Sequence, residues 1–437
     1  MADLRPYQTE AIAAVREHFR NGVRSVLVVA ATGAGKGTII ASILASTAAK
    51  GRRGLFVVHR SELVRDIAAR IVAAGVPSVG VEMADETERN GSLVTVGTVQ
   101  SLAAREWGED VDLIVIDEAH RATAATYRAL LARCPGARVV GFTATPQRGD
   151  GTALGDVFQA LVLAATPADL VRDGYLVSCE VVAPPARKAT LALSPVDAHR
   201  EYAKGPAIVF CKSVAHAQRE AEAFRAAGVT AESVEGKLDD AERARRFARF
   251  ASGETAVLTN CQLVTEGYDI PAVQCIILAS GSAHAGAFLQ KVGRARRPSP
   301  GKTHATIVDL VGSVWDCGLP DEERTYSLKG KPISVQGDTD ELALRSCLEC
   351  GRIGRAARWG EYGCPFCGYV SPGKPDPKVV AAEMQVVKDA KRAQIVARQM
   401  TAESVALLRE RGRKGFARVM NRWPWREELV AAGMAAP

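Results

Sequence analysis

Aromatic residues and long apolar runs are scarce in this chain of 437 residues. Aromatic side chains make up 5% of it, and it has no run of 18 apolar residues, the approximate length that a membrane-spanning helix needs. The first ten residues, MADLRPYQTE, lack the basic and then apolar pattern of a signal peptide. With 47% hydrophobic and 24% charged residues, the composition is typical of a soluble globular protein, which we expect to be cytoplasmic.

Positive charge is concentrated in one segment. The net charge is +7, and residues 388–426 alone hold 11 Lys or Arg against 3 Asp or Glu, so the rest of the chain is close to neutral. A basic segment of this kind is typical of nucleic-acid binding, and a solvated helical face is the alternative. Its Trp423 and Trp425 are suited either to stacking on single-stranded bases or to packing.

The ten cysteines fall into two groups. Four form two Cys-x-x-Cys pairs separated by thirteen residues, which predicts a zinc ribbon with one knuckle per pair. Two disulfides or a redox pair are the alternatives. The predicted zinc ligands are Cys347, Cys350, Cys364 and Cys367. The other six are expected to be core residues in a reducing compartment, namely Cys134, Cys179, Cys211, Cys261, Cys275 and Cys317.

Basic and aromatic residues lie between the two knuckles. Their charge and stacking capacity would suit them to nucleic acid, and an exposed hairpin of the ribbon is the alternative. These residues are Arg352, Arg355, Arg358, Trp359 and Tyr362.

Short apolar runs alternate with Ala-rich helical stretches over the first 310 residues. Apolar runs without regular polar alternation indicate strands buried on both faces, and hence parallel sheets between layers of helices. The expected strands are 25–30, 55–58, 93–96, 113–116 and 139–142, followed by 207–210, 256–258, 275–278 and 305–308. Helices are expected at 216–227 and 239–251. Two α/β domains in tandem are implied.

The expected domain boundaries follow from changes in this pattern. Residues 1–165 and 166–315 form the two α/β domains, residues 316–344 a linker, and residues 345–371 the zinc ribbon. After a Gly- and Pro-containing segment, residues 378–437 form a basic helical tail.

A glycine-rich turn follows the first expected strand. Gly33 and Gly35 allow backbone N–H groups to approach phosphate oxygens, and Lys36 can reach the β- and γ-phosphates from the start of the next helix. The predicted nucleotide-binding segment is Thr32, Gly33, Ala34, Gly35, Lys36, Gly37 and Thr38. Position 37 departs from the pattern, because a Ser or Thr hydroxyl ordinarily ligates Mg²⁺ there.

Two carboxylates follow the expected strand at 113–116. They lie at the C-terminal end of that strand, where ligands bind in open α/β sheets. Asp117 can hold the Mg²⁺ of a nucleotide, and Glu118 can orient and deprotonate an attacking water. Together with the phosphate loop, the pair predicts a site of nucleotide hydrolysis.

The sequence of residues 117–120, Asp-Glu-Ala-His, resembles the DEAH box of superfamily 2 helicases, and further motifs of that family appear in order over residues 4–310. The resemblance implies two RecA-like P-loop domains. In the first domain it assigns Arg5 and Gln8 to the adenine base, Arg60, Thr98 and Gln100 to the nucleic-acid backbone, and His120, Thr143 and Thr145 to the coupling of hydrolysis with domain movement.

The second domain carries the remaining motifs. Residues 290–297 resemble the sixth motif, and on a helix the spacing of Arg294 and Arg297 would point both at the γ-phosphate. The implied catalytic set is Lys36, Asp117, Glu118, Gln290, Arg294 and Arg297. Residues 265–271 resemble the fifth motif of restriction-enzyme-like and DNA-repair-like members, which implies nucleotide contacts for Gly267 and Asp269 and a nucleic-acid contact for Thr265.

The resemblance implies an ATP-dependent helicase or translocase that uses ATP, Mg²⁺ and Zn²⁺ and acts on DNA in preference to RNA. The tail weakly resembles those of phage and prophage helicases, so a bacterial cell or a phage-infected host is expected. One alternative is the motor subunit of a restriction or recombination system with a nuclease or replication partner. Another is an ATP-gated nucleic-acid clamp that hydrolyses poorly because of Gly37.

Overall fold

The computed structural model describes residues 4–370, apart from 60, 62–63, 85, 89–90, 106–110, 148–151, 184–192, 204, 262–271, 283, 331–332, 337–341 and 360–362. Several sequence predictions therefore lie outside the described residues. They concern Arg60, Tyr362, the fifth-motif residues Thr265, Gly267 and Asp269, and the basic tail at 378–437.

The first lobe is built on an eight-stranded sheet in the order β4-β3-β5-β2-β6-β7-β1-β8. Neighbouring strands are parallel except for the pair β3 and β4. The strands are β1 (Ser25–Ala30), β2 (Arg53–Val58), β3 (Val79–Met83), β4 (Glu86–Glu88), β5 (Val94–Thr98), β6 (Val111–Ile116), β7 (Arg138–Thr143) and β8 (Ala160–Ala165).

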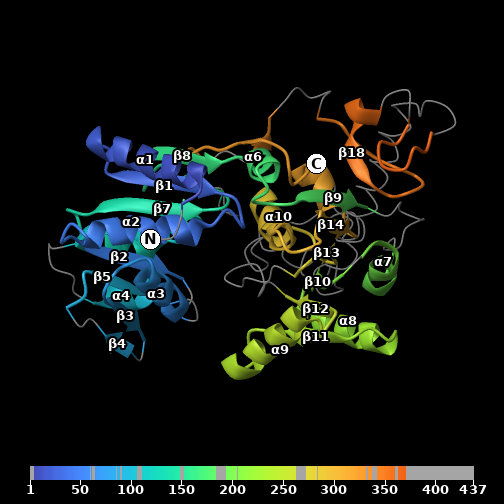
Figure 1. Cartoon of the computed structure of the whole chain (residues 1–437), viewed down its shortest axis with the longest axis horizontal. Coiled ribbons are helices and arrows are strands. Elements are labelled where there is room, and N and C mark those ends of the chain that lie inside the picture. The colour runs from blue at the N-terminus through green and yellow to red at the C-terminus, as the bar shows by residue number, and fades with distance from the viewer. Residues whose placement is uncertain are drawn as a thin grey trace, which may run out of the picture. The chain divides into compact units, whose positions relative to one another are not determined.

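The helices of the first lobe begin where local chemistry favours a start. Pro6 opens α1, where its missing N–H is not needed, and the side chain of Gln8 accepts a hydrogen bond from Arg5 N at 3.0 Å. Figure 1 shows α1 lying along β1 and β8, which it contacts. The helices are α1 (Pro6–Arg20), α2 (Lys36–Ala48), α3 (Val64–Ala73), α4 (Val99–Ala104), the short η2 (Ala119–Arg121) and α5 (Ala125–Arg133).

The second lobe is built on a six-stranded parallel sheet in the order β11-β12-β10-β13-β14-β9. Its strands are β9 (Ser178–Val182), β10 (Ala207–Phe210), β11 (Ala231–Val234), β12 (Val257–Asn260), β13 (Cys275–Leu278) and β14 (His304–Asp309). Its helices are α7 (Pro195–Tyr202), α8 (Val214–Ala226), α9 (Asp240–Ser252), α10 (Ala285–Val292), the short η4 (Gly293–Ala295) and α11 (Ser313–Cys317). The helix α6 (Pro167–Arg172) lies between β8 and β9 in the chain, and its Leu170 packs into the core of the first lobe. No helix in the described part of the chain is long and apolar enough to cross a bilayer.

Two short antiparallel pairs follow the second sheet. β15 (Arg324–Thr325) pairs with β16 (Ser334–Val335), and β17 (Leu344–Ser346) pairs with β18 (Ile353–Arg355), which leads into η5 (Ala356–Trp359). The second pair belongs to the segment that carries the clustered cysteines.

Each large sheet has an apolar core on both faces. In β1, Val26 and Val28 pack into one core cluster, whereas Leu27 between them packs into another. In β10, Ile208 and Val209 likewise belong to different clusters. Burial on both faces is the physical reason that these strands read as continuous apolar runs.

The predicted fold class is confirmed, because the structure contains two α/β lobes with large parallel sheets. All nine predicted strands are present within a few residues of the expected ends. The structure adds five strands to the two large sheets, namely β3, β4, β8, β9 and β11, and the two short pairs β15–β16 and β17–β18.

Substituting Gly141 in β7 should destabilise the first lobe. A Cβ atom at this position would lie 2.4 Å from Phe158 Cζ and 2.7 Å from Ala119 Cβ. We expect Gly141→Ala to lower the free energy of unfolding by about 1–3 kcal/mol, the usual cost of overpacking a core. Chemical denaturation followed by circular dichroism measures it. Gly136→Ala is the control because nothing lies within 4 Å of its Cβ position, and equal stability of the two variants would contradict this packing.

Candidate active site

The phosphate loop connects β1 to α2 and depends on two glycines in the left-handed region. Gly33 has a φ of 90° and Gly35 a φ of 75°. A Cβ atom on Gly33 would lie 2.8 Å from Leu176 Cδ2, and one on Gly35 would lie 2.7 Å from Gln8 Nε2. The loop therefore requires glycine for both conformation and space, and it ends at the N-terminus of α2, where backbone N–H groups favour phosphate oxygens. These features fit a bound nucleotide.

The first turn of α1 braces this loop. Gln8 is buried, and its Nε2 donates to Ala34 O at 3.3 Å, while Tyr7 Oη donates to the same carbonyl at 2.6 Å. The guanidinium of Arg5 lies 4.3 Å from the ring centroid of Tyr175, in the connection between the two lobes. In this structure Arg5 and Gln8 thus shape the loop, and their assignment to adenine remains a prediction.

The acidic pair lies directly after β6, at the C-terminal edge of the sheet. Asp117 Oδ1 accepts a hydrogen bond from Glu118 N at 2.9 Å. Among the described residues, Glu118 is the one non-glycine residue with a positive φ, at 46°. Strained backbone of this kind persists only where its surroundings enforce it, and it clusters at functional sites. Asp117 offers a carboxylate for Mg²⁺, whereas Gly37 offers no hydroxyl.

Glu118 is held as a carboxylate by its neighbours. Burial raises its pKa, but the hydrogen bond from His120 and the charges of Lys36, His120 and Arg294 outweigh this and lower the pKa to about 2. Its buried Oε2 atom lies 3.3 Å from His120 Nδ1. A buried and ionised oxygen of this kind fits the orientation of an attacking water.

The residues assigned to coupling form one network. His120 Nδ1 lies 3.3 Å from both Glu118 Oε2 and Thr143 Oγ1. Thr143 Oγ1 in turn donates to the carbonyl of Thr145 at 2.9 Å and accepts from Thr145 N at 3.1 Å. The structure thus joins the DEAH-box histidine to the threonines that follow β7.

Residues of the sixth motif contact the phosphate loop from the second lobe. A Cβ atom on Gly293 would lie 2.5 Å from Thr32 Cβ, and Arg297 Cγ lies 3.5 Å from the Cβ position of Gly33. Arg294 is buried, and its charge helps to lower the pKa of Glu118. The structure therefore brings Lys36, Glu118 and Arg294 to one site.

One premise about this motif was wrong. Arg294 and Arg297 do not share a helix face, because α10 ends at Val292 and Arg294 lies in the short η4. Arg297 lies beyond η4, where Pro298 disfavours the helical conformation of the residue before it. Both arginine side chains nevertheless lie toward the first lobe.

Arg296 is a functional residue that the sequence did not single out. It is buried, its side chain pairs with Asp321 at 2.5 Å, and its carbonyl accepts a hydrogen bond from Val177 N at 2.8 Å. Arg296 therefore fastens the connection between the lobes. The motif assigned roles to Arg294 and Arg297 and gave no signal for a structural role of the arginine between them.

A hollow of about 420 Å³ lies beside this network. It collects residues from the segments assigned to nucleic acid, to coupling and to the sixth motif. They include His59, Gln100, His120, Thr145, His284 and Gln290. Gln100 is thus placed as expected for a ligand contact, whereas the hydroxyl of Thr98 is buried and caps α4 by accepting from Ser101 N at 3.3 Å.

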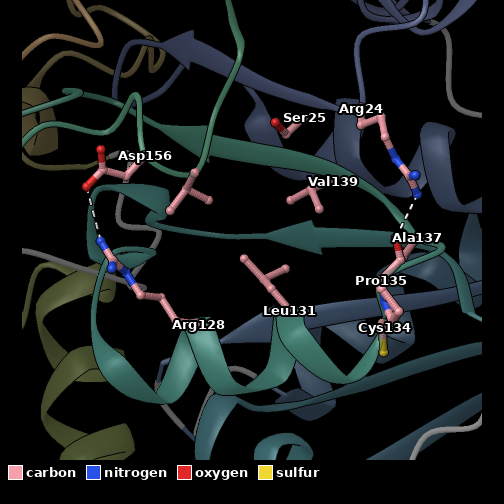
Figure 2. Close-up of a pocket in the computed structure, with 10 residues that line it drawn as sticks. Arg24, Ser25, Arg128, Leu131, Cys134, Pro135, Ala137, Val139 and Asp156 are labelled. Carbon is pink, nitrogen blue, oxygen red and sulfur yellow. Dashed lines mark hydrogen bonds and ion pairs between the residues drawn. The ribbon is translucent and has the colours of Figure 1, made fainter.

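A second hollow, of about 330 Å³, lies at the opposite edge of the first sheet (Figure 2). It adjoins Ser25 and Val139, near the beginnings of β1 and β7. Arg24 closes one side by donating to Pro135 O and Gly136 O at 2.8 and 2.7 Å. Because ligands bind at the carboxyl ends of parallel strands, we assign no site to this hollow.

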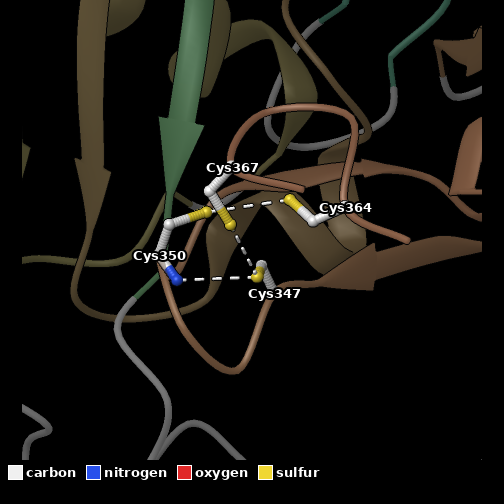
Figure 3. Close-up of side chains that lie close together, drawn as sticks. All are labelled: Cys347, Cys350, Cys364 and Cys367. Carbon is white, nitrogen blue, oxygen red and sulfur yellow. Dashed lines mark hydrogen bonds between the residues drawn. The ribbon is translucent and has the colours of Figure 1, made fainter. Parts of the chain in front are cut away.

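The four clustered cysteines converge as the sequence predicted (Figure 3). Their sulfur atoms all lie within 4.8 Å of one another, with Cys347 Sγ 3.7 Å from Cys367 Sγ and Cys350 Sγ 3.8 Å from Cys364 Sγ. Tetrahedral zinc with Zn–S bonds of about 2.3 Å places sulfur atoms about 3.8 Å apart. The cluster therefore fits a metal ion, and none of its cysteines forms a disulfide.

Most of the basic and aromatic residues between the knuckles have structural partners. Arg352 Nε donates to Glu180 Oε2 at 2.9 Å, and Arg355 pairs with Glu322. Trp359 is 3% exposed and lies under the guanidinium of Arg345. Of the described residues in this set, Arg358 is the exposed one. Arg352, Arg355 and Trp359 therefore have structural contacts, and the buried Trp359 does not belong to an exposed hairpin.

The ribbon is joined to the second sheet at the end of β9. Ala183 N donates to Gly351 O at 3.1 Å, and Val182 forms an isolated antiparallel bridge with Arg352. Ile353 packs into the core of the second lobe. The cysteine cluster is thus attached to the edge strand of that sheet.

Comparisons with known protein families agree with this site. The family described as "Type III restriction enzyme, res subunit" matches residues 1–148, and the family described as "Helicase conserved C-terminal domain" matches residues 191–299. The two matches fall on the two lobes in the order that the motifs require.

Two relatives resemble most of the chain. A Saccharomyces cerevisiae protein named as a candidate ATP-dependent helicase, IRC3, is 29% identical over 71% of this chain and 52% of its own length. A 51.5 kDa protein of a Lactococcus phage is 28% identical over 77% of this chain and 76% of its own length. The chain thus spans about half the length of the yeast protein.

Solved structures share the fold. A fragment of a candidate HsdR subunit of a type I restriction enzyme from Vibrio vulnificus has a TM-score of 0.57 at 23% identity, over 75% of this chain and 67% of that one. The restriction-modification enzyme LlaBIII bound to DNA has a TM-score of 0.54 at 18% identity, over 71% and 28%. Yeast Dbp5 bound to RNA has a TM-score of 0.52 at 17% identity, over 73% and 93%.

Two RecA-like lobes that meet across a phosphate loop define a helicase-type nucleotide site. The chain carries, in order, a lobe of the restriction-enzyme res-subunit family and a helicase C-terminal lobe, which are the two motor lobes of superfamily 2 helicases.

The contact of Gly293 with Thr32 should be required for a closed site. Because a Cβ atom would lie 2.5 Å from Thr32 Cβ, we expect Gly293→Ala to hold the lobes apart and to lower ATP turnover at least tenfold. Nucleotide affinity should change little, since the phosphate loop is intact. Steady-state turnover and equilibrium binding of a fluorescent ATP analogue measure the two effects. Thr32→Gly in the same chain should restore part of the turnover, and an unchanged rate in Gly293→Ala would contradict the contact.

Proposed function

We propose that this chain is an ATP-dependent DNA translocase or helicase, in which Lys36, Glu118 and Arg294 form the hydrolysis site. The observation that carries this proposal is the position of Glu118. Its carboxylate, from the first lobe, experiences the charges of Lys36 from the phosphate loop and Arg294 from the second lobe. A site divided between lobes couples nucleotide turnover to their relative movement.

Each residue has a distinct role in the proposed reaction. Lys36 binds the β- and γ-phosphates, Asp117 holds Mg²⁺, and Glu118 orients the attacking water. Arg294 and Arg297 stabilise charge that develops on the transferred phosphoryl group, with Gln290 beside them. Mg²⁺, when bound, would neutralise part of the negative charge of the phosphates. His120, Thr143 and Thr145 relay the state of Glu118 to the hollow that contains Gln100.

DNA is the substrate that the family match favours. The matched first-lobe family is named for a restriction enzyme, and LlaBIII was solved with DNA. Dbp5, solved with RNA, shares the fold to a similar degree, so fold alone does not separate the two substrates. Since the proposed grip is to the backbone, binding should weaken steeply as salt increases.

The four cysteine sulfur atoms have the spacing of a tetrahedral site, which supports zinc as the ion of the ribbon. We place the ribbon at residues 345–371, the two motor domains at 1–165 and 166–315, a linker at 316–344 and a basic tail at 378–437. The sulfur spacing matches Zn–S geometry, and the site is closed by protein ligands, as in structural zinc sites.

A second function is favoured by one observation. Gly37 lacks the hydroxyl that ordinarily ligates Mg²⁺, which would suit a nucleic-acid clamp that binds ATP and hydrolyses it slowly. Such a clamp, or a motor subunit that requires a nuclease or replication partner, would retain the closed site and lose rapid turnover.

Nucleic acid should stimulate ATP turnover. We expect single- or double-stranded DNA to raise the rate at least tenfold and RNA to raise it less, because the site closes only when both lobes are engaged. Lys36→Ala and Glu118→Gln should each lower the stimulated rate by about 10²-fold or more. Phosphate release at several salt concentrations measures this. ATP binding without stimulated turnover would favour the clamp, and stimulation by RNA alone would overturn the choice of DNA.

The cysteine cluster should bind one zinc ion per chain. We expect Cys350→Ser to lower the zinc content and the midpoint of thermal unfolding, because the ribbon is attached to β9 and to the core of the second lobe. Plasma emission spectrometry and scanning calorimetry measure these quantities. Cys134→Ser, outside the cluster, is the control for metal content. Equal zinc content in the two variants would contradict a metal site.

A further inference from the structure

Position 37 is where the phosphate loop departs from the pattern of its family. Gly37 is exposed in the first turn of α2, directly after Lys36. The structure also shows what surrounds the missing side chain. The inference below rests on the proposed nucleotide site and concerns how that site manages without the hydroxyl.

The next residue, Thr38, faces a different side of the loop. Thr38 Oγ1 lies 3.9 Å from the Cβ position of Gly35, and that same position lies 2.7 Å from Gln8 Nε2. Successive residues of a helix point about 100° apart. The Thr38 hydroxyl is therefore directed to the side braced by Gln8, and it does not take the place of a hydroxyl at position 37.

Arg70 lies beside the missing side chain. It belongs to α3, which packs against α2, and its Nη1 lies 3.7 Å from the Cβ position of Gly37. Among the described residues, apart from its chain neighbours and the backbone of α2, no other heavy atom lies within 4 Å of that position. A guanidinium carries a permanent positive charge and binds phosphate oxygens through several N–H groups. The Arg70 guanidinium thus lies close to the position at which the family pattern places the hydroxyl that ligates Mg²⁺.

We propose that Arg70 binds the β- and γ-phosphates of the nucleotide and replaces part of the charge neutralisation that a hydroxyl-anchored Mg²⁺ would supply. The distance of 3.7 Å is an ordinary van der Waals contact, so a Cβ atom at position 37 can be accommodated beside Arg70. Glycine is consequently not needed to avoid a clash with the protein. Because glycine has no side chain, no side-chain atom at position 37 lies between the Arg70 guanidinium and the phosphate loop.

Arg70 should make nucleotide binding less dependent on Mg²⁺. Titration of a fluorescent ATP analogue into the full chain, in Mg²⁺ and in EDTA, measures this without any need for turnover. We expect Arg70→Ala to weaken binding about tenfold in EDTA, the usual effect of losing one charge-assisted hydrogen bond, and less in Mg²⁺. Arg65→Ala is the matched control, because Arg65 lies on the same helix and pairs with Glu86 at 2.6 Å.

A second substitution tests the replacement directly. Adding Gly37→Thr to Arg70→Ala should restore affinity in Mg²⁺ and leave it weak in EDTA, since the new hydroxyl acts through the metal. Circular dichroism verifies that each variant is folded. Equal affinities of Arg70→Ala and Arg65→Ala in both solutions would overturn the proposal.

The outcomes separate this inference from the proposed function. If the unmodified chain binds no nucleotide, both fail. If it binds nucleotide but nucleic acid does not stimulate turnover, the motor function fails, while the affinities of the Arg70 variants still decide the role of Arg70.

Discussion

The structure depends on the close approach of Gly293 to Thr32, which brings the second lobe onto the phosphate loop. A larger side chain at either position would separate Arg294 from Glu118. The charge of Arg294 adds to the hydrogen bond from His120 and the charge of Lys36, which together keep the pKa of the buried Glu118 low. Arg294 comes from the second lobe, so part of this stabilisation depends on the closed arrangement.

Much of this architecture could be predicted from sequence for a specific reason. Strands such as β1 and β10 are buried on both faces, and such burial selects continuous apolar runs that stand out from their surroundings. β9 and β11 contain Glu180 and Glu232, whose carboxylates pair with arginines, so they lack that signal. The phosphate loop and acidic pair were also predictable, because their chemistry is carried by residues adjacent in sequence.

Other features of the site depend on contacts between distant residues and left no local signal. The sixth motif singled out Arg294 and Arg297, but only the structure shows that the buried Arg296 between them turns to Asp321. From the sequence, Trp359 resembles an exposed stacking residue. In the structure it is buried by Arg345 and the ribbon. The role of Arg70 likewise depends on α3 lying against α2, which no spacing within the phosphate loop reveals.

The short stretch of chain that includes β9 reaches from one site to the other. Leu176, just before β9, packs on Gly33, and Ala183, just after it, is hydrogen-bonded to the first cysteine knuckle. Between them the strand is paired along its whole length with β14, so it can neither shorten nor coil. At the usual rise per residue, this strand forms a rigid connection of about 16 Å. The phosphate loop and the cysteine cluster are thus joined by one continuous, fully paired strand.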